Sequence, residues 1–376
     1  MLSYLTLWEQ VSVQGWLRAL IALAAVALLI PLLVPAAEHL GLTDHPNGRK
    51  RHAAPTPMHG GLTILVAMVA SAALFKDMAS SAMVAFYLSG GLLLLVGVVD
   101  DLKDITWKWR IGAQIAAALI MIYLGGVSVQ QLSDVVGVKG LMLGWIAVPV
   151  TVFVVVGTIN ALNMADGVDG LAGGQALVSL LLFTCFALYA GNVTSAERLL
   201  AVAGTVLGFL WWNLRRPGLP RARVFLGDAG SMLLGFVIAW TAVRLTQNAA
   251  HPVSPVLGPW TIALPLIDCV SLILRRLRQG RSPFAADRDH LHHLLLDAGY
   301  SATAIAVGAM IASLILGLAA AVALKMGIYR PLLVVIFFAL IGLHYHLTAD
   351  RARAVEFFRR LRDKRHESGL PIESND

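Results

Sequence analysis

The chain has 376 residues, of which 58% are hydrophobic and 14% are charged, and its formal net charge at pH 7 is +7. Soluble globular domains carry roughly a quarter charged residues, so this composition excludes an ordinary water-soluble domain. The apolar residues form separate runs of about 17–22 residues, each long enough to cross a bilayer as a helix. Period-2 alternation, the pattern of a β-barrel, is absent from them. The sequence therefore predicts an all-α, polytopic transmembrane helical bundle.

Eleven such runs are predicted to span the membrane. In chain order they cover residues 16–36, 60–76, 81–99, 110–126, 143–160, 173–191, 197–213, 230–247, 258–274, 302–325 and 330–348. An odd number of spans places the two termini on opposite sides of the membrane. Cys185 and Cys269 both fall within apolar runs, so we interpret them as ordinary hydrophobic residues.

The lysines and arginines are distributed unevenly over the connecting segments. Of the 29, 22 fall in one set of alternate loops and in the C-terminal tail, and the other seven are Arg18, Lys76, Lys139, Arg198, Arg244, Lys325 and Arg330. Loops rich in basic residues face the cytoplasm, which predicts a periplasmic N-terminus and a cytoplasmic C-terminus. We expect one transmembrane domain over residues 1–350 with five cytoplasmic loops, followed by a basic cytoplasmic tail over residues 351–376. The start of this tail fits an amphipathic surface helix or a solvated segment about equally.

The loop after the first span contains the basic run RKRH, residues 49–52, followed by a turn rich in proline and glycine. Such a turn is typical of a binding loop, and Arg51 is a candidate substrate-binding residue. The positive-inside rule by itself would also account for these charges.

Two adjacent carboxylates, Asp100 and Asp101, close the third span in the segment VVDDLKDITWKWR. Adjacent carboxylates repel one another unless a cation lies between them, and such a pair suits a divalent metal or acid–base chemistry. Lys103 adds a positive charge suited to a phosphate group. The alternative interpretation is a solvated helix end without a chemical role.

The segment NALNMADGVDGLAGG follows the fifth span. Asn160, Asn163, Asp166 and Asp169 recur every third residue, so we expect one helical face to present four oxygen ligands or hydrogen-bond acceptors. The glycines between them allow close approach of a backbone and an anion-receptive turn. Polar groups at membrane depth are costly, which favours a functional role over a structural one.

Asp228 lies in the segment VFLGDAGSMLLGF, immediately before an apolar run. A carboxylate at a helix N-terminus is also an ordinary cap. Asp228 is nevertheless a candidate site residue, because it shares the predicted cytoplasmic side with the other acidic residues.

The largest predicted cytoplasmic loop contains AADRDHLHHLLLDAGY, with Arg288, His290, His292 and His293. Three histidines raise the alternative of zinc, but no cysteine lies nearby and the acidic partners favour a hard cation. Histidine and arginine donors beside a carboxylate–metal site more often bind phosphates. The whole set predicts metal-assisted phosphoryl transfer with magnesium, and the helices would supply a hydrophobic groove for a lipid substrate.

In this order and spacing, the motifs DDxxK, NxxNxxDGxDGL, FLGD and HxHH resemble the polyprenyl-phosphate N-acetylhexosamine-1-phosphate transferase family, glycosyltransferase family 4, from about residue 41 to 300. The HLHH form resembles the bacterial GlcNAc-1-phosphate branch rather than the MurNAc-pentapeptide branch. One departure is His59 in TPMHGG, where a hydrophobic residue is expected.

The resemblance implies transfer of GlcNAc-1-phosphate, or a related N-acetylhexosamine-1-phosphate, from the UDP-sugar to undecaprenyl phosphate with release of UMP. This reaction would begin a lipid-linked surface glycan, such as the lipopolysaccharide O-antigen, at the bacterial inner membrane. The implied cofactor is Mg²⁺, with Mn²⁺ as a substitute. The implied partners are the UDP-sugar, undecaprenyl phosphate and membrane lipid, without nucleic acid, and the sequence does not decide whether the protein is a homodimer.

The resemblance also implies roles for individual residues. Asp100 and Asp101 match the acidic pair, one of which deprotonates the lipid phosphate, and Asn163 and Asp228 match positions associated with magnesium. The substrate-binding matches are Asp166 and Asp169 in the nucleotide–metal pocket, Phe225 beside the uracil, and Arg288, His290, His292 and His293 around the phosphates and sugar of the donor. We expect Arg51, Lys103 and Asn160 to bind substrate as well.

Two other function classes fit parts of the pattern. Asp100, Asp101 and Asp104 also spell DDxxD, the magnesium-binding motif of intramembrane prenyltransferases, although the HxHH loop argues against that class. A secondary transporter would carry carboxylates near mid-membrane in two repeated halves. Here the acids lie at helix ends on one predicted side, and no inverted repeat is visible.

Overall fold

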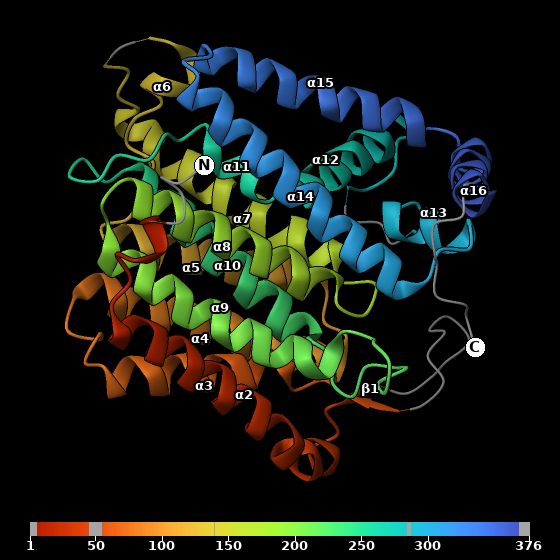
Figure 1. Ribbon diagram of the computed structural model, residues 1–376, viewed down its shortest axis with the longest axis horizontal. Coiled ribbons are helices and arrows are strands. Elements are labelled where there is room, and N and C mark those ends of the chain that lie inside the picture. The colour runs from red at the N-terminus through yellow and green to blue at the C-terminus, as the bar shows by residue number, and fades with distance from the viewer. Residues whose placement is uncertain (1–5, 45–54, 139, 284–286, 368–376) are drawn as a thin grey trace.

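The computed structural model describes residues 6–44, 55–138, 140–283 and 287–367, and the predicted binding residue Arg51 lies outside them. The described residues form a bundle of long helices with one two-stranded antiparallel sheet, which confirms the predicted helical class (Figure 1). The elements are α2 (Val13–His39), β1 (Thr43–Asp44), β2 (Thr56–Pro57), α3 (Gly60–Leu74), α4 (Ser81–Lys103), α5 (Trp107–Tyr123), α6 (Ser133–Val136), η1 (Gly144–Ile146), α7 (Ala147–Ala165), α8 (Leu171–Tyr189), α9 (Val193–Asn213), α10 (Gly227–Thr246), α11 (Leu257–Thr261), α12 (Ala263–Arg278), α13 (Leu291–Asp297), α14 (Ala302–Lys325), α15 (Arg330–Thr348) and α16 (Arg351–Glu367).

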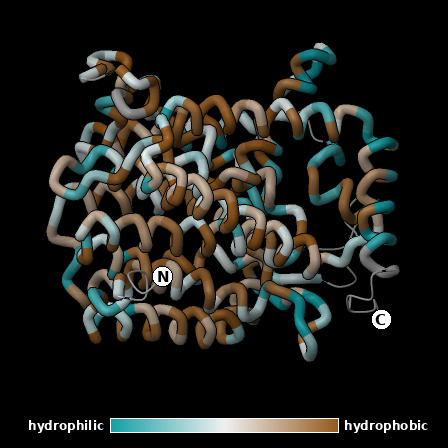
Figure 2. Tube along the Cα trace, turned by 45° about the horizontal axis from the view of Figure 1, so that its top comes forward, coloured by the Kyte–Doolittle hydropathy of each residue, from teal (hydrophilic) through white to brown (hydrophobic). Residues whose placement is uncertain are grey.

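The predicted apolar runs all fall on helices, and the run at 258–274 is divided between α11 and α12. Eight helices in the described part of the chain are long and apolar enough to cross a membrane. The helices α3, α5 and α12, of 15, 17 and 16 residues, are shorter than these. Hydrophobic residues fill the helical body of the bundle, while hydrophilic residues gather toward its ends (Figure 2). These features are those of a helical membrane protein.

Consecutive long helices run in opposite directions, so the loops between them gather at two ends of the bundle (Figure 1). We call the end at which α4 and α7 finish and α10 begins the carboxylate end, and the opposite end the far end. The sheet, α13 and α16 also lie at the carboxylate end. All the predicted motif segments that the structure describes therefore meet at one end. The basic tail begins there as α16, which confirms that its first part is helical.

The helix α10 is the central element, with nearly every residue from Ala229 to Leu245 buried. Its N-terminal turn touches α3 and α4 through glycines. A β-carbon on Gly61 would lie 2.3 Å from the Cα of Gly230, and one on Gly97 would lie 2.3 Å from the Cα of Ala229. Small residues allow such backbone contact between membrane helices, and here they fix the position of the first turn of α10.

Two carbonyl groups of α2, which contains Pro31 and Pro35, contact side chains from other elements. Pro31 has no N–H for the carbonyl of Ala27, which instead accepts a hydrogen bond of 2.8 Å from the indole of Trp212. The ring of His59 lies 3.0 Å from the carbonyl of Ile30 and is almost completely buried. The family departure at His59 is thus explained by packing against the interrupted helix.

The contact at Gly97 makes a testable prediction about stability. Gly97→Ala should lower the thermal stability of the purified protein, because its β-carbon would press on the backbone of α10, and overpacking typically costs about 1–3 kcal/mol. Gly91→Ala is the matched control on the same helix, because nothing lies within 4 Å of a β-carbon there. Equal melting temperatures for the two variants would contradict the proposed backbone contact.

Candidate active site

Asp101 joins the end of α4 to the beginning of α10. Its Oδ1 accepts a hydrogen bond of 2.8 Å from the backbone N–H of Asp228, and its Oδ2 accepts one of 3.2 Å from Ala229. The free N–H groups and the dipole at a helix N-terminus both favour an anion there. Gly227 makes room, because it has φ +73° and a β-carbon on it would lie 2.6 Å from Oδ2 of Asp101. The contact places the side chain of Asp228 beside the acidic pair.

Asp100 is buried, with 5% of its surface exposed, so it does not fit the alternative interpretation of a solvated helix end. Its carboxylate accepts hydrogen bonds of 2.9 Å from the N–H of Ile105 and 3.0 Å from the guanidinium of Arg110. The same guanidinium nitrogen lies 3.6 Å from Oδ1 of Asp228. Arg110, one of the 22 basic residues assigned to the predicted cytoplasmic segments, therefore bridges two carboxylates of the site.

Asn163 and Asp228, the two positions predicted for magnesium, are in direct contact. The amide of Asn163 donates hydrogen bonds of 2.5 Å to Oδ1 of Asp228 and 2.8 Å to the hydroxyl of Ser231. Asp228 does not cap its own helix, because Asp101 occupies that place. The side chain of Asp228 is about one third exposed and remains accessible to a ligand.

The expectation that Asn160, Asn163, Asp166 and Asp169 share one helical face is wrong. A step of three residues turns about 300° around a helix, so such a row drifts by about 60° per step. The helix α7 also ends at Ala165, and the two aspartates lie in the following glycine-rich turn.

The four side chains accordingly have different surroundings. Asn160 donates to the amide oxygen of Gln114 at 2.6 Å and to the carbonyl of Val156 at 2.8 Å, so it is held among helices. Asp169 forms an ion pair of 2.6 Å with Arg215. Asn163 and Asp166 are the two members of the row that join the acidic group at Asp228.

Asp166 reaches solvent, although protein encloses it on most sides. This enclosure and, after it, repulsion from Asp228, Asp101 and Asp169 raise the pKa of Asp166 well above its ordinary value. Among the described residues, no group of three or more His, Cys, Asp or Glu side chains is arranged to hold a metal ion. The carboxylates around Asp166 repel one another, and a positive charge between them would relieve that repulsion.

The histidine cluster is organised by Asp268, a residue that the sequence analysis missed. Asp268 is buried, and its carboxylate lies 2.9 Å from Nδ1 of His290 and 3.1 Å from Nε2 of His344. It also accepts a hydrogen bond of 3.0 Å from the N–H of Leu291 at the start of α13. A lone acid within an apolar run was the available signal, because such residues are costly unless they have partners.

His292 and His293 pack together beside His290, with ring centroids 4.2 Å apart. A β-carbon on Gly167 would lie 2.1 Å from Nε2 of His292, so this cluster contacts the turn that carries Asp166. Burial, followed by the charges of His293 and His290, lowers the pKa of His292 to about 3. Burial, followed by the charge of Arg288, lowers the pKa of His293 to about 4. Both rings are therefore neutral at physiological pH.

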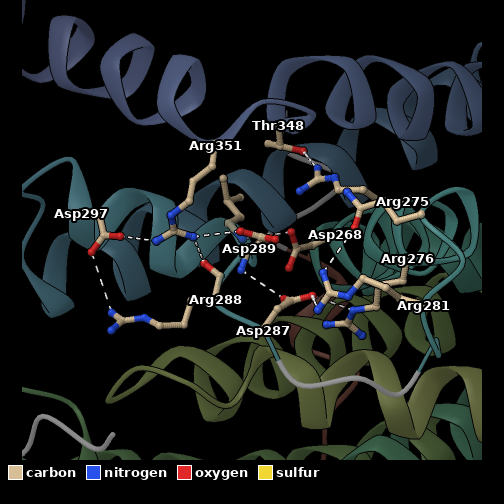
Figure 3. Close-up of polar contacts among 12 residues, drawn as sticks. Asp268, Arg275, Arg276, Arg281, Asp287, Arg288, Asp289, Asp297, Thr348 and Arg351 are labelled. Atoms are coloured by element: carbon tan, nitrogen blue, oxygen red, sulfur yellow. Dashed lines mark hydrogen bonds and ion pairs between the residues drawn. The ribbon is translucent and has the colours of Figure 1, made fainter. Parts of the chain in front are cut away.

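Ion pairs hold the loop before α13 on both sides (Figure 3). Arg276 of α12 contacts Asp287 at 2.8 Å, and Arg351 of α16 contacts Asp289 at 3.0 Å and also pairs with Asp297. Arg288 forms a longer ion pair, 3.8 Å from Asp297, and its side chain is 44% exposed. Of the predicted donor-binding residues in this loop, Arg288 thus supplies the accessible positive charge.

Comparison with known proteins gives the family. Residues 83–246 match the model of glycosyl transferase family 4. A curated undecaprenyl-phosphate alpha-N-acetylglucosaminyl 1-phosphate transferase from Yersinia pestis is 35% identical over 324 residues, which cover 86% of this chain and 88% of the relative. Proteins of the same name from Escherichia coli O157:H7 and Haemophilus influenzae are 34% identical over 89% of this chain and 92% of the relative, and 36% identical over 72% and 76%. The chain belongs to glycosyl transferase family 4.

The predicted family is therefore confirmed, and the structure describes two further predicted site residues of this family 4 member. Phe225 is partly buried; its N–H donates to the carbonyl of Pro57 at 2.8 Å, and its carbonyl accepts from Gly60 at 3.1 Å. Lys103 is exposed in the last turn of α4, two residues after Asp101. Both residues lie at the carboxylate end.

Asp268→Asn should weaken use of the sugar-nucleotide donor, because an amide is a poorer acceptor for two histidines and an N–H. Loss of such buried interactions costs about 1–3 kcal/mol each, so we expect a fall of about tenfold or more in kcat/KM for the donor. The exposed Asp363→Asn on α16 is the control. Steady-state kinetics with each substrate varied in turn measure the effect, and an unchanged donor kcat/KM would remove Asp268 from the functional site.

Proposed function

We propose that this protein transfers GlcNAc-1-phosphate, or a related N-acetylhexosamine-1-phosphate, from the UDP-sugar to undecaprenyl phosphate and releases UMP. The observation that carries this proposal is the convergence of four distant motifs at one end of the bundle. Asp101 binds the N-terminus that carries Asp228, Asn163 binds Asp228, and His292 packs against Gly167. The activity in the names of the curated relatives supports the same reaction.

The reaction exchanges one diphosphate linkage for another. An oxygen of the lipid phosphate attacks the phosphorus that carries the sugar, and the bond from this phosphorus to the bridging oxygen breaks as UMP departs. A carboxylate of the pair Asp100 and Asp101 accepts any proton remaining on the lipid phosphate. Both carboxylates are held rigidly by hydrogen bonds, so the protein acts mainly by positioning and by balancing charge.

The acidic half of the site fits a divalent cation. Asn163, Asp166 and Asp228 offer the amide and carboxylate oxygens that magnesium and manganese prefer. When bound, Mg²⁺ would neutralise the diphosphate of the donor. These side chains would hold it, with Arg110 balancing the charge of Asp100.

The histidine half of the site fits the donor. Arg288 supplies an exposed positive charge for phosphate, while the neutral rings of His292 and His293 supply uncharged polar contacts. Asp169 and Phe225 are assigned to substrate by the family resemblance, and Lys103 and the more deeply held Asn160 by their side-chain chemistry. For Arg51, which lies outside the described residues, the substrate-binding role is proposed from the sequence alone.

The proposal includes a location in the cell. We assign the carboxylate end to the cytoplasm of a bacterium and the bundle to its inner membrane, with eleven spans and a periplasmic N-terminus. Residues 1–350 would form the catalytic domain and residues 351–376 a basic cytoplasmic tail. The product would begin a lipid-linked surface glycan.

Substitutions in the acidic segment test the reaction against the prenyltransferase alternative. Asp100→Asn and Asp101→Asn should each lower UMP release by roughly 10²–10⁴-fold, because a general base or its charge is lost. Asp104→Asn should have little effect, because Asp104 is exposed and has the left-handed φ of +49° that asparagine tolerates. A prenyltransferase using the DDxxD motif would instead require Asp104.

The assay follows UMP release and prenyl diphosphate consumption by purified protein with a panel of UDP-sugars. Activity of Asp100→Asn and Asp101→Asn within a few-fold of wild type would contradict the proposed site. Consumption of prenyl diphosphate that depends on Asp104 would establish the alternative class.

Reporter fusions test the location of the site. Fusions after Arg216 and Arg281 should report the cytoplasm, and fusions after Asn192 and Asn248 should report the periplasm, because the basic residues crowd the loops at the carboxylate end. A periplasmic signal at Arg281 would place the sugar-nucleotide loop on the wrong side for a cytoplasmic donor.

A further inference from the structure

Two cavities lie at the far end of the bundle, and Arg244 near the end of α10 lines both. The first, of about 130 Å³, lies among α3, α4, α9 and α10 and is mainly apolar, with Met83, Phe86, Val202 and Trp240 in its wall. The second, of about 260 Å³, is lined by the polar segments around Ser128 and Gln247. An apolar and a polar cavity thus meet at one arginine.

The charge around the apolar cavity is not balanced. Asp77 accepts 2.7 Å and 3.1 Å contacts from Arg18 and Arg198, which use both of its oxygens. The buried Nε atoms of these two arginines have no hydrogen-bond partner within the part of the chain that the structure describes. Glu197 is directed to the N–H of Ser12. Arg244 is exposed and adds a further positive charge.

This concentration of charge is unexpected from the sequence pattern. Only seven of the 29 lysines and arginines fall outside the predicted cytoplasmic segments, and three of them, Arg18, Arg198 and Arg244, lie at this corner. The positive-inside rule disfavours basic residues on this side. Asp77 is the anionic partner of Arg18 and Arg198, which leaves Arg244 without one among the residues that the structure describes.

The position of Arg244 matches the depth of a lipid phosphate. Sixteen residues of α10 separate it from Asp228, which is about 24 Å along the helix axis at 1.5 Å per residue. The hydrocarbon core of a bilayer is about 30 Å thick. Arg244 therefore lies near the opposite membrane surface from the carboxylate site, where phospholipid headgroups are found.

We propose that Arg244 binds the phosphate of an anionic glycerophospholipid in the outer leaflet. Part of one acyl chain enters the apolar cavity beside Val202 and Trp240, and the polar headgroup enters the cavity beside Ser128 and Gln247. Arg198 provides a second positive charge at the wall of the apolar cavity. This site is separate from the transfer chemistry, and its assignment to the outer leaflet rests on the proposed orientation of the bundle.

Native mass spectrometry of the detergent-purified full chain tests the site, with dioleoyl phosphatidylglycerol and dioleoyl phosphatidylcholine as probes. Both lipids carry a phosphate, but the choline of the second adds a positive charge that Arg244 and Arg198 would repel. Wild type should therefore bind the anionic lipid at least about tenfold more tightly. Arg244→Gln should lose most of this preference. Lys325→Gln is the control, because Lys325 is exposed at the same end and lines neither cavity. Val202→Phe, which narrows the apolar cavity, should weaken binding of the long-chain lipid by a similar factor.

Several outcomes would overturn the proposal. One is an equal lipid preference in wild type and Arg244→Gln, and another is an equal loss in Lys325→Gln, which would indicate only a general charge effect. Competition by inorganic phosphate as strong as that by the long-chain lipid would indicate a free-anion site. If Arg244→Gln does not fold, Val202→Phe decides, and unchanged binding of dioleoyl phosphatidylglycerol by that variant refutes the site.

Discussion

The contact between Asp101 and the N-terminus of α10 is the interaction on which the site depends. It satisfies two backbone N–H groups that a buried helix would otherwise leave free, and it fixes the first turn of the most buried helix. The position of Asp228 follows from that turn, and the contacts of Asn163 and Arg110 follow from Asp228. A carboxylate that would be costly in an apolar bundle thus sets the geometry of the elements around it.

The two halves of the site have complementary charge. The acidic half holds Asp100, Asp101, Asp166 and Asp228 against one bridging guanidinium, so it lacks positive charge. The loop half presents the exposed Arg288 beside neutral histidines. A divalent cation would supply the positive charge that the acidic half lacks, and a diphosphate would supply negative charge beside Arg288 in the loop half. This arrangement explains why phosphate chemistry fits the site better than transport of a single ion.

The sequence predicted the helices and motifs well because the length of an apolar run directly reflects the membrane thickness. It did not predict the partners of Asp100, Asn160 or Asp169, because these depend on the rotation of each helix about its axis. The three-residue spacing predicted one helical face from Asn160 to Asp169, but the helix ends at Ala165 and a glycine-rich turn follows. Asp268 was overlooked because its partners, His290 and His344, are 22 and 76 residues away in the chain.

The contacts of Asp268 also determine how the histidine loop can act. An ionised carboxylate only accepts hydrogen bonds, so Nδ1 of His290 and Nε2 of His344 must each carry the hydrogen in these contacts. With the N–H of Leu291 as a third donor, Asp268 has little capacity left for a metal ion. Asp268 therefore fixes the orientation of His290 and leaves its Nε2 as the ring nitrogen that can contact a substrate, while His292 and His293 supply uncharged polar contacts beside it.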